Sequence, residues 1–303
     1  MGRDVGPSKG RGAIGVNRLA LGTAQFGSDY GIANTVGRIP DADAAALLAH
    51  AWRAGVRTLD TAIAYGDSEA RLGALGVGDW RVISKLPAMP ADVDAVRWVA
   101  DAVDGSLGRL QRRSLSALLL HRPQQLLEPA GESLYEGLRQ VKAAGLVEKI
   151  GVSIYDPAEL DALTSRFTFD IIQAPFSVID RRLAESGWLA RLAAAGAEVH
   201  VRSVFLQGLL LMPINARPEK FARWSSVWSR WDQWLHAAGI SPVDACLRYA
   251  LSVPEVDCAV VGVDSVGQLD EILRAAGGSM PPLPADLRSS DPDLVNPSRW
   301  MSL

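Results

Sequence analysis

Short apolar runs alternate with longer amphipathic stretches along most of this chain. The apolar runs predict strands at residues 19–23, 58–62, 81–86, 115–121, 149–154, 170–174, 198–204 and 258–263. The amphipathic stretches predict helices at residues 41–55, 68–76, 91–110, 129–145, 156–166, 183–196, 241–254 and 265–276. Strands that are apolar throughout and alternate with helices are typical of a parallel sheet buried on both faces. Eight such units predict a single-domain α/β fold, the (β/α)8 TIM barrel.

Three segments lie outside this repeating pattern. We expect the barrel to span residues 18–276, after a flexible polar lead at 1–17. A long connection at 206–239 follows the seventh strand, and a tail rich in Pro, Ser and Asp follows the barrel at 277–303. We expect the tail over or beside the barrel mouth, and because it carries few apolar residues, we expect the core not to need it. A doubly wound open sheet is the alternative, but it would usually need fewer strands or a second domain.

Composition narrows the classes of function that fit. The chain has 303 residues, 48% of them hydrophobic, and a net charge of −3, which argues against a nucleic-acid partner because such proteins need a basic face. There is no run of about 18 apolar residues that could cross a membrane, and the polar N-terminus lacks the apolar region of a secretory signal. The two cysteines, Cys246 and Cys258, make neither a disulfide framework nor a zinc cluster. A reducing cytoplasm is therefore the expected location.

Two further patterns do not indicate sites. The glycine motif at 10–15 fits GxGxxG, but it precedes the first strand, whereas the motif binds dinucleotides only between a strand and a helix. His50, His200 and His236 are scattered along the chain and suggest no metal site.

Four polar residues of different chemistry end three successive predicted strands. Asp60 lies in the second strand and Tyr65 in the loop after it, while Lys85 and His121 end the third and fourth. In barrels of this kind the active site lies at the carboxyl ends of the strands. We therefore expect a carboxylate, a phenol, an amine and an imidazole to converge at one mouth of the barrel.

This combination suits the reduction of a carbonyl group. Tyr65 can give a proton to the carbonyl oxygen if its pKa falls from about 10, and an adjacent Lys85 ammonium would lower that pKa by favouring the phenolate. Asp60 would balance the buried ammonium, and His121 would orient the carbonyl oxygen through a hydrogen bond. Each residue alone has an ordinary structural explanation, such as a loop cap or a core histidine. Four compatible types at neighbouring strand ends favour chemistry.

Several segments resemble the signatures of the aldo-keto reductase superfamily. They are LDTAIAYGDSEARLG at 59–73, VISKLP at 82–87, LLLHRP at 118–123, GLVEKIGVS at 145–153 and IIQAPFSVIDRR at 171–182. The resemblance runs in order from residue 19 to about residue 272. It implies a barrel that binds NAD(P)(H) across its mouth, with Tyr65 as general acid and base and with Asp60, Lys85 and His121 as its partners.

The same resemblance implies a set of cofactor-binding residues. They are Gly22, Thr23, Asp60, Ser153, Gln173, Arg202, Ser203, Phe205, Gln207, Gly262, Ser265 and Gln268. The chain departs from the family pattern at four positions that matter. Ile154 stands where Asn is frequent, and Arg202 stands where an aromatic residue commonly stacks on the nicotinamide. Gln268 stands where a basic residue often grips the 2′-phosphate, and Ile272 where an Asn often follows.

The choice between NADP and NAD depends on positive charge near the last helix. The expected contact positions at 264, 265 and 268 carry no basic side chain, which favours NAD. The superfamily more often uses NADP(H), and the long connection offers Arg217, Lys220 and Arg223 as cations that could reach a phosphate. We expect use of both cofactors, with NADP(H) slightly preferred.

These observations predict an oxidoreductase that interconverts an aldehyde, ketone or sugar carbonyl and its alcohol. The segment TAQFGSDYGIAN at 23–34 resembles that of bacterial members thought to act on sugars. The alternative is a cofactor-binding regulatory subunit that senses redox state with little turnover. A metal-dependent hydrolase barrel is a weaker alternative, because ligand clusters are missing.

Tryptophans recur in the long connection at spacings of four, three and three residues, at Trp224, Trp228, Trp231 and Trp234. This spacing predicts one aromatic face of a helix. The face either packs against the barrel or lines a substrate pocket. The same two alternatives hold for Trp300 in the tail.

Overall fold

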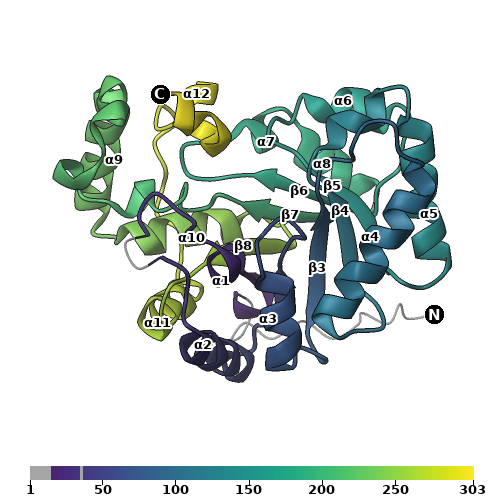
Figure 1. Cartoon of the computed structure of the whole chain (residues 1–303). Coiled ribbons are helices and arrows are strands. Elements are labelled where there is room, and N and C mark those ends of the chain that lie inside the picture. Colours follow the sequence, from purple (N-terminus) through teal and green to yellow (C-terminus); the bar gives the residue numbers. More distant parts are fainter. Residues whose placement is uncertain (1–14, 35–36) are drawn as a thin grey trace, which may run out of the picture.

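The computed structural model describes residues 15–34 and 37–303, and in it eight parallel strands form one closed barrel (Figure 1). The strands follow one another around the barrel in chain order, and β1 closes it by pairing with β8. Their bounds are β1 Leu19–Gly22, β2 Thr58–Asp60, β3 Arg81–Leu86, β4 Ala117–Leu120, β5 Ile150–Ser153, β6 Ile171–Pro175, β7 Glu198–Arg202 and β8 Cys258–Gly262. The predicted (β/α)8 barrel is therefore confirmed. The lead predicted at 1–17 and the glycine motif lie largely outside the described residues.

Helices cover the outside of the barrel, as Figure 1 shows. Those that follow the strands are α2 Asp41–Ala54, α3 Ser68–Leu75, α4 Ala95–Leu110, α5 Gly131–Ala143, α6 Glu159–Thr164, α7 Arg182–Glu185, α8 Trp188–Ala194, α10 Pro242–Ser252 and α11 Val266–Ala275. Short elements that the pattern did not predict are η1 Val16–Arg18, α1 Ala24–Gly27 and η2 Pro123–Leu127.

Two differences from the predicted elements have local causes. The helix predicted at 183–196 is divided into α7 and α8, because Gly187 between them has a left-handed φ of 79°. The strand predicted at 198–204 ends at Arg202, because Ser203 has a φ of 59°, which is incompatible with an extended strand.

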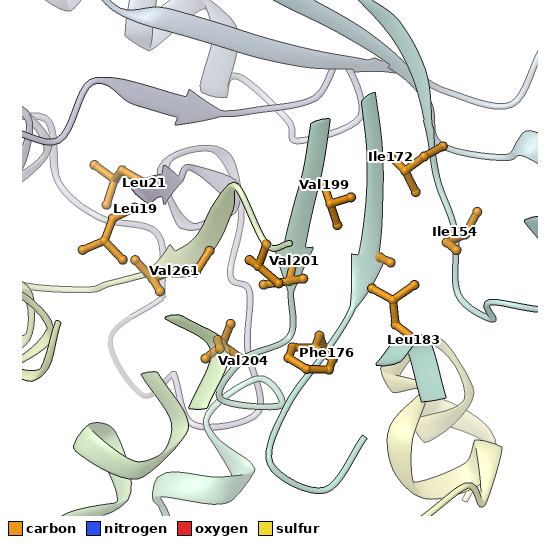
Figure 2. Packing of buried hydrophobic residues seen from close by; sticks show 14 of the residues in the cluster. Leu19, Leu21, Ile154, Ile172, Phe176, Leu183, Val199, Val201, Val204 and Val261 are labelled. Carbon is orange, nitrogen blue, oxygen red and sulfur yellow. The ribbon is translucent and has the colours of Figure 1, made fainter. Parts of the chain in front are cut away.

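Side chains alternate along each strand between the helices and the interior of the barrel. Figure 2 shows part of the buried apolar cluster between strands and helices, which includes Val199 and Val201 of β7 together with Phe176 and Val204. Residues that face the other way form a smaller apolar cluster inside the barrel, namely Ile83, Ala117, Leu119 and Ile171. Lys85 and Gln173 each lie two residues beyond a member of this interior cluster, so polar side chains replace apolar ones toward the carboxyl ends of the strands.

The long connection after β7 and the C-terminal tail pack on each other. The connection contains η3 Leu209–Leu211, η4 Ile214–Ala216, η5 Glu219–Trp224 and α9 Ser225–Ala238, and the tail contains α12 Pro292–Val295 and η6 Pro297–Ser302. Trp224 of η5 donates a hydrogen bond to the Asp291 carboxylate at 2.9 Å, and Trp234 of α9 donates to the Pro282 carbonyl at 3.0 Å. Both acceptors belong to the tail.

The tail is part of the core, which corrects the expectation that the core does not need it. Trp300 is 4% exposed and meets the ring of Phe221 edge to face, with the ring centres 4.9 Å apart. Leu287, Leu294 and Val295 are buried in the same apolar cluster as the barrel strands. The few apolar residues of the tail are therefore concentrated where it meets the long connection and the barrel.

Both cysteines are buried as free thiols, Cys246 on α10 and Cys258 on β8. None of the helices in the described part of the chain combines the length and the apolar character that crossing a membrane requires.

Candidate active site

The carboxyl ends of β2, β3 and β6 bring an ion pair and an amide together inside the barrel. Lys85 donates to Asp60 Oδ1 at 2.6 Å and to the carbonyl oxygen of Thr61 at 2.9 Å. Gln173 Nε2 donates to Asp60 Oδ2 at 2.7 Å. Asp60 and Lys85 are 4% and 0% exposed. Buried charges need both a counter-charge and further hydrogen bonds, and Thr61 and Gln173 provide the latter.

Tyr65 lies in the loop after β2, beside His121, which directly follows β4. The two rings meet edge to face with their centres 5.8 Å apart, and Lys85 Nζ lies 5.2 Å from the centre of the Tyr65 ring. The structure thus brings the carboxylate, phenol, amine and imidazole together at the mouth of the barrel.

Two glycines allow the Tyr65 loop to approach α1. Gly66 has a left-handed φ of 55°, and a Cβ there would lie 2.3 Å from the carbonyl oxygen of Gly27. A Cβ on Gly27 would lie 1.7 Å from the carbonyl oxygen of Tyr65. Either side chain would therefore displace the loop that carries Tyr65. The sequence did not indicate these glycines, because their role arises from a contact between two loops.

The surroundings favour a protonated Tyr65 and a neutral His121 near neutral pH. Burial raises the pKa of Tyr65 far above its usual value, the Asp60 charge adds to this effect, and Arg202 opposes it. Burial, with the charges of Lys85 and Arg202, lowers the pKa of His121 to about 4. We expected Lys85 to lower the pKa of Tyr65, but its ammonium is hydrogen-bonded to Asp60. The cation that lowers this pKa is instead Arg202.

A cavity of about 710 Å³ opens beside Tyr65. It is lined by most of the cofactor-binding residues that the sequence implied, namely Gly22, Thr23, Asp60, Gln173, Arg202, Ser203, Phe205, Gln207, Gly262 and Gln268. Ser153 and Ser265 do not line it. Ser153 is buried and donates to Gln173 Oε1 at 3.2 Å, and Ser265 caps α11 by accepting from the Gln268 backbone N–H at 3.2 Å.

A sequence model of the aldo/keto reductase family matches residues 18–283. The chain belongs to the aldo/keto reductase family. The 6-dehydroglucose reductase of Novosphingobium aromaticivorans is 26% identical over 284 residues, which cover 86% of this chain and 87% of that protein. Aldo-keto reductase YhdN of Bacillus subtilis is 23% identical over 255 residues, which cover 75% of this chain and 76% of that protein. The holo form of aldo-keto reductase AKR11C1 from Bacillus halodurans shares the fold, with a TM-score of 0.71, 20% identity and 88% of each chain covered.

Membership of the family makes the protein an oxidoreductase that acts on carbonyl compounds. Aldo/keto reductases generally use NAD(P)(H). Lys85 and His121 stand outside the residues that line the cavity of this aldo/keto reductase, whereas Tyr65 lines it. Asp60 also lines the cavity, but its two carboxylate oxygens already accept from Lys85 and Gln173. Tyr65 is therefore the side chain of the four that is best placed to meet a bound molecule.

The loop after β7 is strained where it borders the cavity. Ser203, Leu206 and Gln207 have φ values of 59°, 50° and 51°. A left-handed backbone costs a residue other than glycine roughly 1–2 kcal/mol. Gln207 Nε2 donates to Tyr30 Oη at 3.2 Å, which ties this loop to the loop after β1. Backbone strain of this kind clusters at ligand sites, so it supports a binding role for the loop.

The end of the cavity at α10 and α11 carries three carboxylates, those of Asp244, Asp264 and Glu271, beside the cation Arg274. Burial raises the pKa of Asp264, whose Oδ1 has no hydrogen-bond partner among the described residues. This wall of the aldo/keto reductase is therefore a poor site for a second phosphate, unless Arg274 binds it.

The three cations proposed to grip a 2′-phosphate are engaged elsewhere. Arg217 donates to both carboxylate oxygens of Asp232, at 2.8 and 3.0 Å. Lys220 donates to the Trp300 carbonyl at 2.7 Å, and Arg223 donates to the Asp293 carboxylate at 2.8 Å. None of the three lines the cavity, because their contacts hold the long connection and the tail together.

The tryptophans serve packing, which decides between the two alternatives left open by their spacing. None of Trp224, Trp228, Trp231, Trp234 and Trp300 lines the cavity. Trp228 donates to the Phe221 carbonyl at 2.8 Å, and Trp231 donates to the Leu210 carbonyl at 3.1 Å. Sequence reasoning missed two other aromatic residues near the site, Tyr30 in the cavity wall and Tyr155 against Arg202.

Proposed function

We propose that this aldo/keto reductase interconverts a sugar or another aldehyde or ketone and its alcohol with NAD(P)(H), and that Tyr65 is the general acid and base. The observation that carries this proposal is the position of the half-buried Tyr65 phenol, which lines the cavity beside His121 and the Asp60–Lys85 ion pair. The raised pKa of Tyr65 keeps the phenol protonated at neutral pH. A phenol in that state can protonate a carbonyl oxygen at neutral pH. The name of the relative 6-dehydroglucose reductase supports a sugar carbonyl as the substrate.

The cavity fits a dinucleotide. Its volume of about 710 Å³ lies within the range of ligand sites, and its lining extends from Tyr65 to Arg274 of α11. At Gly262, a Cβ would lie 2.5 Å from Gln25 Nε2, so a larger residue there would displace that amide. Gln173, which Ser153 supports, would hold the nicotinamide amide, and the residues of the strained loop would hold the pyrophosphate. When bound, the nicotinamide supplies or accepts the hydride.

Several residues of the chain take part in the proton transfer. During reduction, Tyr65 gives its phenolic proton to the carbonyl oxygen, where negative charge develops; during oxidation, the phenolate takes the proton back. Lys85 favours the phenolate through Asp60, whose negative charge it neutralises, and Arg202 favours it through its own positive charge. His121, neutral at this pH, donates a hydrogen bond that orients the carbonyl oxygen.

For the cofactor, we propose dual use with a preference for NADP(H) smaller than about 100-fold, or roughly 2.7 kcal/mol. The absence of Arg217, Lys220 and Arg223 from the cavity lining supports weak discrimination, and the carboxylates near α11 act in the same direction. Arg274 remains as the cation that would favour the extra phosphate. The ratio of kcat/KM for the two reduced cofactors with one good substrate tests this point.

The test of the proposed reaction is a panel of aldehydes, ketones and sugars followed by NAD(P)H absorbance, with the wild-type protein and Tyr65→Phe. We expect turnover of several carbonyls by the wild type, and a loss of roughly 10²–10⁴-fold in Tyr65→Phe with little change in cofactor affinity. If the wild-type protein binds the reduced cofactor but the cofactor transfers its hydride only slowly to every carbonyl tested, the protein would instead be a redox-sensing subunit. Undiminished chemistry in Tyr65→Phe would exclude Tyr65 as the acid.

A further inference from the structure

Arg202 is a half-buried cation without a counter-charge. It ends β7 and lines the cavity together with Tyr65. Within residues 15–34 and 37–303 it forms no ion pair, because the carboxylates at neighbouring strand ends bind other cations. Asp60 pairs with Lys85, and Asp156 and Asp180 both pair with Arg182. Keeping a charge partly out of water without a partner is unfavourable, so the position favours a counter-ion that the protein does not itself supply.

The guanidinium of Arg202 is held in place on three sides. Its Nη2 donates to the Ile154 carbonyl at 2.9 Å, and its Nη1 donates to Ser203 Oγ at 3.3 Å. Its central carbon lies 4.4 Å from the centre of the Tyr155 ring. These contacts leave Nε without a protein acceptor in the described part of the chain. A guanidinium fixed in this way matches the planar geometry of a carboxylate and the oxygens of a phosphate.

The charge of Arg202 acts at the reacting end of the cavity. Arg202 lines the cavity together with Tyr65 and Asp60, and its charge lowers the pKa values of Tyr65, His121 and Lys85. Because Asp60 and Lys85 neutralise each other, Arg202 leaves this end positive. The opposite end, near α11, carries the carboxylates described above. An anion is therefore favoured at the Tyr65 end, where Arg202 has no carboxylate partner among the described residues.

Building on the proposed carbonyl reduction, we propose that Arg202 binds an anionic group of the substrate, a carboxylate or a phosphate, and selects acidic carbonyl compounds over neutral ones. The substrate places its carbonyl at Tyr65 and its anionic group at Arg202. Arg202 is thus a specificity-determining residue, and the favoured substrates are sugar acids, sugar phosphates and other aldehydes or ketones that carry a negative charge.

Matched pairs of substrates test the proposal. Para-carboxybenzaldehyde and its methyl ester differ in charge at nearly constant shape, and glycolaldehyde phosphate with glycolaldehyde tests phosphate in place of carboxylate. For the wild type we expect kcat/KM to favour the charged member of at least one pair by about tenfold or more, mainly through KM. The pair with the larger ratio identifies the anion that the site prefers.

Three variants separate charge from shape. Arg202→Met should abolish the preference for the charged member, whereas Arg202→Lys should retain part of it. The control Arg191→Met removes an exposed arginine that also lies over an aromatic ring, 3.5 Å from the centre of Trp188, and should leave the preference unchanged. If a variant turns over too slowly, the Kd of benzoate and the Kd of benzamide are measured separately by equilibrium titration, and their ratio gives the same selectivity.

The outcomes distinguish this proposal from the proposed reaction. Turnover of neutral members without any charge preference, or an equal preference in wild type and Arg202→Met, overturns the role of Arg202 and leaves the reaction standing. A cofactor Kd that rises more than about tenfold in Arg202→Met with the preference intact also overturns it, because Arg202 would then bind the cofactor. A wild-type protein that reduces no member of the panel overturns both proposals.

Discussion

Tyr65 lies among charges whose effects on its phenol oppose one another. Asp60 raises the pKa of the phenol, and Arg202 lowers it. Lys85 acts mainly through Asp60, whose negative charge it neutralises at 2.6 Å. The acid strength of Tyr65 therefore depends on the Asp60–Lys85 ion pair, of which Tyr65 is not a member, and on an arginine at the end of β7.

Replacing Lys85 by Met should move the pH dependence of alcohol oxidation upward. Oxidation needs the phenolate, and without Lys85 the unpaired Asp60 carboxylate would disfavour it further. Removing one partner of a buried ion pair should also destabilise the fold by about 3–5 kcal/mol. Rate profiles from pH 6 to 10 measure the first effect, and urea unfolding measures the second.

The control is Lys142→Met, which breaks a partly exposed ion pair with Asp170 and should leave the pH profile of oxidation unchanged. An unchanged profile in Lys85→Met would mean that Lys85 does not influence Tyr65.

The sequence predicted where Asp60 and Lys85 lie, because polar residues at the ends of apolar strands have few alternative places in a barrel. It did not predict the neighbours of Arg202. Tyr155 lies in an irregular loop after β5, and Tyr30 lies in another after β1. The path of such loops follows from contacts between segments far apart in the chain, which hydrophobic periodicity does not encode.

At the scale of elements, the strands were easier to predict than the long connection. Each barrel strand is a continuous apolar run whose partners are its neighbours in the chain. By contrast, α9 and the tail stabilise each other across more than 40 residues of sequence, as in the hydrogen bond from Trp234 to the Pro282 carbonyl. The aromatic spacing predicted one aromatic face of a helix and left open what that face contacts, and the structure shows that Trp224 and Trp234 bind the tail.

Trp300→Ala should destabilise the protein by about 3–5 kcal/mol, because it removes a buried indole that packs on Phe221. The neighbouring Met301 is 99% exposed, so Met301→Ala is the matched control and should change stability by less than about 0.5 kcal/mol. Chemical denaturation followed by tryptophan fluorescence measures both. Equal stability of the two variants would show that the tail is dispensable, as its composition first suggested.

At the scale of the whole molecule, the cavity joins the first and the last strand of the barrel. Its lining combines Gly22 of β1, Gln173 of β6 and Gly262 of β8 with residues of α10 and α11. A molecule bound there contacts the two strands whose pairing closes the barrel. Ligand binding and barrel closure should therefore be thermodynamically linked.

Thermal unfolding should consequently respond to both cofactors. At a concentration of 100 times the Kd, NADH or NADPH should stabilise the folded protein by about 2.7 kcal/mol, which raises Tm by roughly 5 °C. Arg274→Ala should reduce the shift produced by NADPH more than that produced by NADH, because Arg274 is the cation beside the carboxylates of that wall. A shift with NADPH alone would contradict dual use, and no shift with either would contradict cofactor binding.

The two buried thiols allow the opening of the barrel wall to be measured by chemical labelling. Cys246 on α10 and Cys258 on β8 are shielded from solvent, and burial raises the pKa of each, so neither reacts while the barrel stays shut. Alkylation by a thiol reagent must then wait for the wall formed by β8 and α10 to open. The labelling rate of the wild-type protein, which needs no mutation, reports how often that wall separates. We expect bound cofactor to slow the labelling of both residues, which mass spectrometry of the two peptides would resolve individually.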